Sequence, residues 1–308
     1  MMKVHYSFYR SVKCRVVLVM RIGVIGATGF IGKEFCKQAL LKGHDVVGYS
    51  RKARVDDEIQ WREFSDVPDL SELDAIVNYA GESVAQRWSE KKKVAFATSR
   101  VGVTHTIVAE IEKMSPEQRP KVLFNSSAVG YYGDCASEKL DEKSSKGEGY
   151  LADLCEDWES SALKAQKLGV RVVIGRIGLV MGKGGEAWEK MYNTFRMGLG
   201  GPLGTGRQWM PWVDVKDVAG GTLYTLETEI SGAVNLVSPV PMENSEFTKV
   251  FAESLGRPAI FRVPEFALRL LFGDFGTHIL DSYRAYPKVL NESGYSFTSA
   301  SLEDFLKS

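Results

Sequence analysis

Short apolar runs alternate with amphipathic segments along most of this chain. Residues 22–25 form an apolar run typical of a buried strand, and apolar side chains then recur at helical spacing from Ile31 to Leu40. A second apolar run follows over residues 45–49. Strand, helix and strand in this order form a βαβ unit. The pattern therefore predicts an α/β protein built on a parallel sheet.

The same alternation continues to about residue 240. Apolar runs predict further strands at residues 59–64, 75–78, 121–125, 170–174 and 233–237, and helical spacing predicts helices at 91–111, 150–162 and 219–226. Residues 198–209 are too rich in glycine for a regular helix or the interior of a sheet, so we expect a loop that passes over the cleft. Residues 242–308 alternate amphipathic helices and short strands, which predicts a smaller C-terminal domain.

Three glycines stand where the first strand gives way to the first helix. Gly26 permits a tight turn, Gly29 lets the backbone approach a pyrophosphate, and Gly32 lets the helix pack closely on the sheet. Glycine spacing alone is weak evidence, but here a strand and a helix flank it correctly. The residues predicted to contact a nucleotide here are Gly26, Thr28, Gly29, Phe30, Ile31 and Gly32. We expect a Rossmann-type, doubly wound parallel sheet over residues 21–240, with the substrate-side domain over 241–308.

The second strand ends in Ser50-Arg51-Lys52. Folds that prefer NAD usually place an acid here to hold the ribose 2′-hydroxyl, and an acid would repel a 2′-phosphate. The guanidinium of Arg51 can instead grip that phosphate with two hydrogen bonds, and Ser50 can act as a neutral donor. We therefore predict NADP(H) as the cofactor, with a solvated Arg-Lys turn as the alternative.

Charge and composition narrow the classes of partner. The 39 basic and 39 acidic residues cancel, so the chain lacks the electrostatic footprint of a nucleic-acid or anionic-membrane binder. The four cysteines form no C-x-x-C pair and the four histidines lack metal-ligand spacing, so we expect no metal site. We predict a small-molecule substrate and neither nucleic acid nor membrane as a partner, and the sequence leaves a homodimer open.

Residues 1–20 carry four basic residues and no acid, a composition typical of an organelle transit peptide. The alternative is a disordered extension or a misassigned start, because Met20-Arg21 directly precedes the first strand. The predicted location is therefore the mitochondrion or another organelle if this segment is a transit peptide, and the cytoplasm otherwise.

Several longer strings follow one another in a fixed order. They are Gly-Ala-Thr-Gly-Phe-Ile-Gly from residue 26, Asn-Tyr-Ala-Gly-Glu from 78, Gly-Tyr-Tyr-Gly-Asp from 130, Cys-Glu-Asp-Trp-Glu from 155, and Pro-Trp-Val-Asp-Val-Lys-Asp from 211. In these strings the chain resembles the atypical extended short-chain dehydrogenase/reductases called epimerase family proteins, of the 39U type, with their small C-terminal domain. The resemblance covers roughly residues 21–305.

The resemblance implies roles for further residues. It implies dinucleotide contacts at Asp66, Asn78, Ala80 and Gly81. It also implies a hydroxyl that bonds the reacting oxygen. The usual position of that hydroxyl falls on Ala128, and Ser127, one residue earlier, is the candidate for the role.

The chain departs from the extended short-chain reductases in general at one catalytic motif, where the epimerase family proteins that it resembles are themselves irregular. A Tyr-x-x-x-Lys helix is expected, in which the ammonium lowers the pKa of the phenol so that it can exchange a proton. Tyr150 is present, but Leu154 stands in place of the lysine. A leucine can neither lower the phenol pKa nor bind the nicotinamide ribose. Tyr131 or Tyr132 would substitute if the helix register moves Tyr150 away.

These observations support two classes of function and a third, weaker one. The leading hypothesis is an NADP(H)-dependent oxidoreductase that acts on a small carbonyl or hydroxyl substrate, oriented by Arg207, Gln208 and Trp209. The competing hypothesis is an NADP(H)-binding regulator or sensor with little turnover, because Leu154 removes the activating group. A nucleotide-sugar epimerase-like enzyme ranks third, because the sequence has no clear sugar-nucleotide site.

Overall fold

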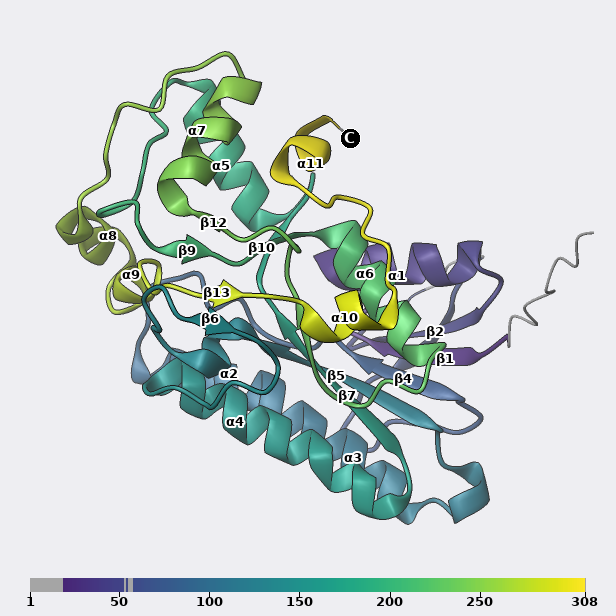
Figure 1. The fold of residues 1–308 in the computed structure, drawn as a ribbon. Coiled ribbons are helices and arrows are strands. Elements are labelled where there is room, and N and C mark those ends of the chain that lie inside the picture. Colours follow the sequence, from purple (N-terminus) through teal and green to yellow (C-terminus); the bar gives the residue numbers. More distant parts are fainter. Residues whose placement is uncertain (1–18, 53, 55–57, 308) are drawn as a thin grey trace, which may run out of the picture.

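The computed structural model of the chain describes residues 19–52, 54 and 58–307. Within these residues, the centre of the molecule is a seven-stranded parallel sheet (Figure 1). In spatial order its strands are β11 (Gly232–Leu236), β7 (Arg171–Ile177), β5 (Val122–Ala128), β4 (Ala75–Asn78), β1 (Arg21–Ile25), β2 (Asp45–Ser50) and β3 (Gln60–Glu63). The chain runs outward from β1 to β3 and then returns to β4 on the other side of β1. This confirms the predicted α/β class and the doubly wound sheet, and the reversal between β1 and β4 is where such sheets bind ligands.

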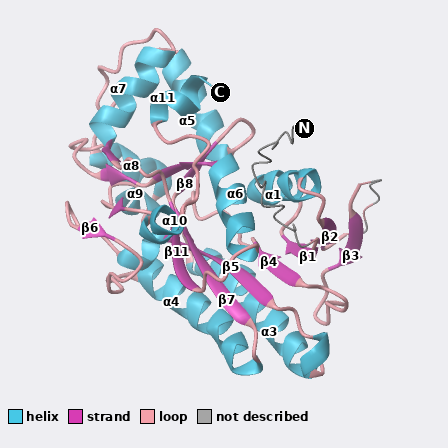
Figure 2. Ribbon diagram, turned by 45° about the vertical axis from the view of Figure 1, so that its right-hand side comes forward, coloured by secondary structure: helices cyan, strands magenta, loops and turns pink. Residues whose placement is uncertain are grey.

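Helices cover both faces of the sheet (Figure 2). α1 (Phe30–Leu41), α6 (Val215–Leu226) and α10 (Lys288–Ser293) pack on one face, and α3 (Val103–Lys113) and α4 (Tyr150–Leu163) pack on the other. Successive side chains in a strand point to opposite faces, so β4 sends Ala75 and Val77 into the first core and Ile76 into the second. Both faces are buried, which explains why the strands are almost continuously apolar in the sequence.

The helix predicted over residues 91–111 forms in three pieces. α2 (Glu90–Ala97) begins after Ser89, whose Oγ accepts a hydrogen bond from Lys92 N. A π-helical turn, η1 (Thr98–Gly102), follows and leads directly into α3. Such turns insert one extra residue and frequently mark functional sites.

A second, smaller core lies beyond the carboxyl ends of the strands. Its helices are α5 (Glu186–Arg196), α7 (Asn244–Ser254) and α11 (Leu302–Lys307), which pack around Phe195, Phe247 and Phe251. Its short strands are β8 (Leu179–Met181), β9 (Trp209–Met210), β10 (Trp212–Asp214) and β12 (Met242–Glu243). α5 precedes residue 241 and yet packs in this core, whereas α10 follows it and packs on the main sheet. The boundary after residue 240 stays a prediction, and the two cores draw on segments from both sides of it.

The remaining elements are short. They are η2 (Pro116–Gln118), η3 (Val129–Tyr132), β6 (Lys139–Leu140), η4 (Lys164–Leu168), α8 (Glu265–Phe272), α9 (Phe275–His278) and β13 (Arg284–Ala285). Residues 198–208 form an irregular loop with a single bridge between Leu203 and Val263, whereas Trp209, the last residue of the predicted loop, begins β9. The loop packs on the C-terminal part of the chain, where Asn244 Oδ1 accepts a hydrogen bond from Leu203 N at 2.8 Å.

The transit-peptide prediction for residues 1–20 falls almost entirely outside the described residues. Met20 is the first buried residue that the structure describes, and its N–H donates to His44 Nδ1 at 3.2 Å. None of the helices described is long and apolar enough to cross a membrane.

Candidate functional site

The turn after β1 has the geometry that its three glycines predict. Gly26 has a φ of 84°, which favours glycine, and its carbonyl accepts the N–H of Gly29 at 2.9 Å. A Cβ at position 32 would lie 2.2 Å from the oxygen of Gly26, so only glycine lets α1 start this close to the strand. No side chain caps the start of α1. Its first N–H groups are therefore available to an anion.

A cavity of about 1020 Å³ opens beside this turn. It is lined by the ends of β1 and β2, by the segment after β4 and by α2 and η1. The cavity brings together the predicted residues Gly26, Thr28, Gly29, Ser50, Arg51, Ala80 and Gly81. Four separate segments of the sequence thus converge on one space at the switch point of the sheet.

One end of the cavity is strongly basic. Arg51, Lys52 and Arg54 line it, and none of the three forms an ion pair with a carboxylate in the described part of the chain. Arg54 was not predicted from the sequence. The one sequence feature that could have indicated Arg54 is its position three residues after Arg51. The cluster offers several charged hydrogen-bond donors, which suit a phosphate better than a neutral ribose hydroxyl.

Other predicted cofactor residues lie behind the cavity wall or away from it. Asn78 is fully buried, its amide donates to Asn125 Oδ1 at 2.8 Å, and its own Oδ1 accepts from Ala80 N at 3.1 Å. It therefore shapes the segment that carries Ala80 and is absent from the lining itself. Asp66 is exposed and also does not line the cavity.

Three predicted contacts at the start of α1 also lie outside the cavity lining. Phe30, Ile31 and Gly32 belong to the first turn of the helix. The ring of Phe30 packs so closely on Gly185 that a Cβ there would lie 2.6 Å from it. This contact ties the start of α1 to the segment that precedes α5.

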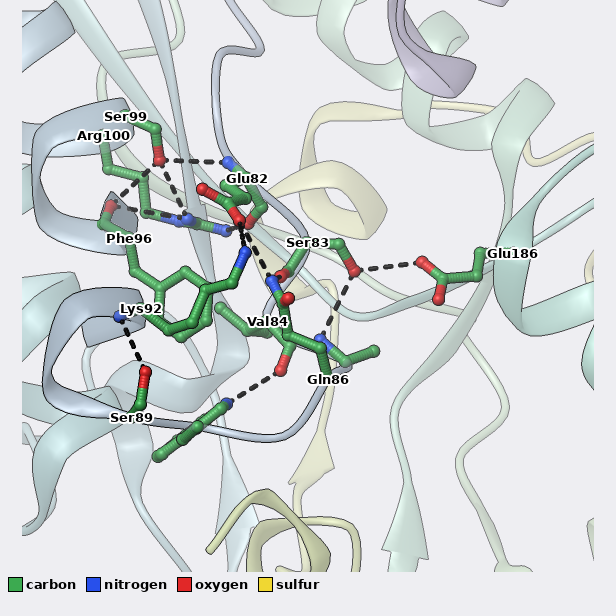
Figure 3. Close-up of polar contacts among 12 residues, drawn as sticks. Glu82, Ser83, Val84, Gln86, Ser89, Lys92, Phe96, Ser99, Arg100 and Glu186 are labelled. Atoms are coloured by element: carbon green, nitrogen blue, oxygen red, sulfur yellow. Dashed lines mark hydrogen bonds and ion pairs between the residues drawn. The ribbon is translucent and has the colours of Figure 1, made fainter. Parts of the chain in front are cut away.

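A polar network fixes the segment after β4 (Figure 3). Glu82 Oε1 accepts from Lys92 Nζ at 2.6 Å and from Gln86 Nε2 at 3.2 Å, and the bond from Lys92 lowers the pKa of the Glu82 carboxyl. The N–H of Glu82 donates to Ser99 Oγ at 3.0 Å, and its carbonyl accepts from Arg100 Nη2 at 2.9 Å. The π-turn thus supplies two of the groups that hold the cavity wall.

The same segment reaches the second core. Ser83 Oγ donates to Glu186 Oε2 at 3.0 Å, which connects the segment to the first turn of α5 (Figure 3). Trp88 also stacks on His278 of α9, with 5.1 Å between the ring centroids. One wall of the cavity is therefore held by both parts of the molecule.

Arg100, a partly buried cation, packs against this wall. Its guanidinium lies 5.3 Å from the ring centroid of Trp158, and it forms no ion pair among the described residues. A Cβ on Gly81 would lie 3.2 Å from its Cζ, so glycine at position 81 makes room for the arginine. Arg100 could not be predicted from the sequence, because its position depends on the π-turn.

Tyr150 stands at the start of α4 but its hydroxyl is engaged. It donates to the carbonyl of Lys93 at 3.2 Å, and its ring packs on Trp88 with centroids 5.2 Å apart. Burial raises the pKa of this phenol, against the opposing effect of Lys93 and Arg100. Leu154 is buried in the same apolar cluster.

Ser127 and Tyr132 belong to a buried polar cluster. Ser127 Oγ donates to Glu159 Oε1 at 2.6 Å, and Glu159 pairs with Arg176 at 2.9 Å. Tyr132 donates to Asn235 Oδ1 at 2.7 Å, and burial raises its pKa to about 12. These contacts occupy both hydroxyls with structural partners.

Tyr131 differs from the other three catalytic candidates. Its side chain is partly buried, as is that of Tyr150, and its ring lies 3.5 Å from Cζ of Arg176. Its hydroxyl makes no hydrogen bond to any residue in the described ranges. Among the four candidates it is the one whose hydroxyl has no partner in the described residues, and none of the four lines the cavity.

The three predicted substrate-side residues have separate environments. Arg207 is exposed, whereas Gln208 is buried and donates to the carbonyl of Leu203 at 3.1 Å. Trp209 lies under the guanidinium of Arg284, 4.1 Å from Cζ to the ring centroid. None of the three lines the cavity. No group of His, Cys, Asp or Glu side chains among the described residues could hold a metal ion.

The chain matches two family models. The NAD dependent epimerase/dehydratase family matches residues 22–236, and a domain of unknown function, DUF1731, matches residues 263–308. A chloroplastic homologue of epimerase family protein SDR39U1 from Arabidopsis thaliana is 35% identical over 300 residues, which cover 94% of this chain and 86% of that protein. SDR39U1 from Mus musculus is 33% identical over 294 residues, which cover 94% of this chain and 99% of that protein.

A solved structure is similar over nearly the whole length. Human SDR39U1 (isoform 2), crystallised with NADPH, superposes with a TM-score of 0.86 at 31% identity and covers 94% of this chain and 98% of that one. A nucleoside-diphosphate sugar epimerase from Corynebacterium glutamicum superposes with a TM-score of 0.74 at 26% identity, covering 93% of this chain and 57% of that one. Together with the family models, these matches confirm the resemblance seen in the sequence: the chain belongs to the NAD dependent epimerase/dehydratase family, among the epimerase family proteins of the SDR39U1 type.

Proposed function

We propose that this protein binds NADP(H) in the cavity beside the Gly26 turn and is an NADP(H)-dependent oxidoreductase acting on a small carbonyl or hydroxyl substrate. The basic end formed by Arg51, Lys52 and Arg54 carries the choice of cofactor. A 2′-phosphate carries two negative charges that such a cluster can neutralise. The human relative crystallised with NADPH supports the same choice.

The rest of the cavity fits a dinucleotide. The uncapped start of α1 offers backbone N–H groups to a pyrophosphate, and the glycines at positions 26 and 29 let that phosphate approach the backbone. Ala80 has only a methyl side chain and Gly81 has none, so a ligand in the cavity can lie against their backbone. When bound, the nicotinamide of the cofactor supplies or accepts the hydride.

For the proton we propose Tyr131, predicted from the sequence as a substitute, alongside Tyr150. Tyr131 lies in η3, the turn that follows β5, and its hydroxyl has no partner among the described residues. The hydroxyl of Tyr150 would first have to leave the carbonyl of Lys93. Ser127 would have to leave Glu159 in the same way to polarise a carbonyl.

Cofactor binding and turnover are tested in two steps. Calorimetry should detect NADPH binding to the purified protein, and absence of binding at millimolar NADPH would refute the proposal at its first step. A panel of carbonyl compounds and sugar nucleotides is then added with NADPH, and oxidation is followed at the nicotinamide absorbance. Tyr131→Phe and Tyr150→Phe assign the proton donor, because only loss of the true donor abolishes substrate-dependent oxidation while NADPH still binds.

A cofactor-binding regulator or sensor is the second candidate. The hydroxyls of Ser127 and Tyr150 are both engaged, and Leu154 packs with Trp88 and Phe96 where a lysine would carry charge. Tight NADPH binding without oxidation of any panel member favours this candidate. Interconversion of a sugar nucleotide without net consumption of cofactor would instead favour the epimerase-like alternative.

We also propose a small molecule as the partner, in preference to nucleic acid or membrane. The balanced charge of the chain supports this, and a homodimer is tested directly by light scattering.

The chloroplastic relative supports an organelle location if residues 1–20 are a transit peptide. A fluorescent protein fused after residue 20 should then enter the organelle, whereas diffuse fluorescence would support the cytoplasm.

A further inference from the structure

Arg284 is a cation without a counter-charge on the substrate side of the molecule. Its guanidinium stacks on Trp209 at 4.1 Å, and its Nε is buried with no hydrogen-bond partner. The terminal nitrogens are not among the buried atoms and make no hydrogen bond or ion pair with any described residue. Stacking on the indole fixes the plane of the guanidinium and leaves its donors free.

A second cation lies directly beside it. β6 and β13 pair in parallel with Arg284 opposite Lys139 and Ala285 opposite Leu140. Leu140 and Ala285 point into a common apolar core, so the two cations share the opposite face of the ladder. Lys139 is exposed and forms no ion pair within the described ranges, and Asp141, two residues later, is already paired with Lys288 at 3.0 Å.

The position of this pair connects it to the end of the sheet where ligands bind. Trp209 N donates to Ser282 Oγ at 3.0 Å, and Ser282 N donates to Asp134 Oδ1 at 3.1 Å. Asp134 comes just after η3, the turn that follows the carboxyl end of β5. Hydrogen bonds therefore join the Arg284 strand to the edge of the sheet that carries Tyr131.

We propose that Arg284 and Lys139, with Trp209 as a platform, form a subsite for an oxyanion of the substrate. Like charges placed opposite each other in a ladder repel. An oxyanion between them removes this repulsion and accepts hydrogen bonds from the two terminal nitrogens of the guanidinium. The proposal rests on the proposed small-molecule function and narrows its substrate to phosphate- or carboxylate-bearing compounds.

The test measures anion binding to protein saturated with NADP⁺, so that the pyrophosphate site is already filled. Inorganic phosphate and malonate are titrated separately by calorimetry at constant ionic strength. Wild type should bind at least one of them, Arg284→Gln should weaken binding about tenfold or more, and Lys139→Gln should weaken it several-fold. The tighter of the two probes identifies the class of oxyanion on the substrate.

Two control variants separate a specific effect of Arg284 from a general loss of charge or of folding. Arg257→Gln removes the same charge from an exposed position after α7 and should leave anion binding unchanged. Arg284→Lys keeps the charge without the fork and should bind with intermediate affinity, which covers the case in which Arg284→Gln does not fold. No anion binding by wild type, or equal binding by the Arg284 and Arg257 variants, overturns the proposal.

The two proposals can fail separately. Arg284→Gln should bind NADP⁺ as tightly as wild type, because Arg284 does not line the nucleotide cavity. If wild type binds no NADP⁺, the proposed function fails, and the anion titrations are still run on the protein alone. Anion binding that requires Arg284 in that protein would uphold the subsite.

Discussion

Single residues determine which charges this molecule accommodates. The exposed cations at the end of β2 have no carboxylate partner among the described residues. The carboxylate of Glu142 has one buried oxygen that accepts no hydrogen bond. Glu142 Oε1 accepts from Asn235 N at 3.0 Å and from Val289 N at 3.2 Å, but Oε2 is buried without a hydrogen bond. Replacing Arg51 should therefore change cofactor affinity, and replacing Glu142 should change stability.

Replacing Arg51 should change the preference between dinucleotides. We expect Arg51→Ala to weaken NADPH binding about 10- to 100-fold, the range of one or two charge-assisted hydrogen bonds, while NADH affinity stays the same. Calorimetry with both cofactors measures the ratio. Lys37→Ala, an exposed change on α1, is the control and should alter neither affinity. An equal loss for NADPH and NADH would contradict a role at the 2′-phosphate.

Replacing Glu142 should remove a dependence of stability on pH. Burial raises the pKa of its carboxyl above the ordinary 4.5, so the folded protein holds this proton more tightly than the unfolded chain. The stability that this proton provides is complete below pH 4.5 and is lost as the pH rises through the pKa of the folded state. Glu142→Gln should therefore be more stable than wild type near neutral pH, by about 1 kcal/mol, and not in acid.

Urea unfolding between pH 4 and pH 8 measures this difference. Glu138→Gln removes an exposed carboxylate from the same segment and should leave the pH profile unchanged. A constant difference between wild type and Glu142→Gln over the whole range would show that the buried charge has no part in it.

At the scale of elements, the sequence predicts the strands and the glycine turn, but it does not predict features that depend on contacts between distant segments. The strands and the glycine turn could be predicted, because buried parallel strands must be apolar and Gly32 has no room for a Cβ. The π-turn could not, because one inserted residue barely alters the helical pattern of residues 91–111. The inward direction of Arg100 depends on that turn, and the free guanidinium of Arg284 depends on partners distant in sequence.

Two glycines in helical segments should respond oppositely to alanine. A Cβ at Gly32 would lie 2.2 Å from the backbone oxygen of Gly26, so α1 must move away from the turn. We expect Gly32→Ala to lose about 1–3 kcal/mol of stability and at least tenfold in NADPH affinity. At Gly102 the nearest atom would lie at an ordinary 3.7 Å, so Gly102→Ala should fold at least as stably as wild type. Thermal unfolding and calorimetry compare them, and similar losses in both variants would contradict the steric argument.

At the scale of the whole molecule, a few polar anchors hold the two cores together. Ser83, next to the segment that lines the nucleotide cavity, donates to Glu186 of α5. On the other side of the sheet, Asp217 at the start of α6 binds the final segment of the chain. Its Oδ1 accepts from Thr298 N at 2.6 Å and its Oδ2 from Ser299 N at 2.9 Å. This segment leads into α11, which belongs to the second core.

Removing the Asp217 anchor should loosen the C-terminal segment before the rest of the protein unfolds. The side chain is 1% exposed, so Asp217→Ala leaves two N–H groups without acceptors and should cost about 2–4 kcal/mol. Limited proteolysis should then cut near residues 296–301 under native conditions, and urea unfolding should begin at a lower concentration. Glu303→Gln, exposed on α11, should change neither result. A protease-resistant tail in Asp217→Ala would mean that the apolar contacts of α11 alone hold this segment on the second core.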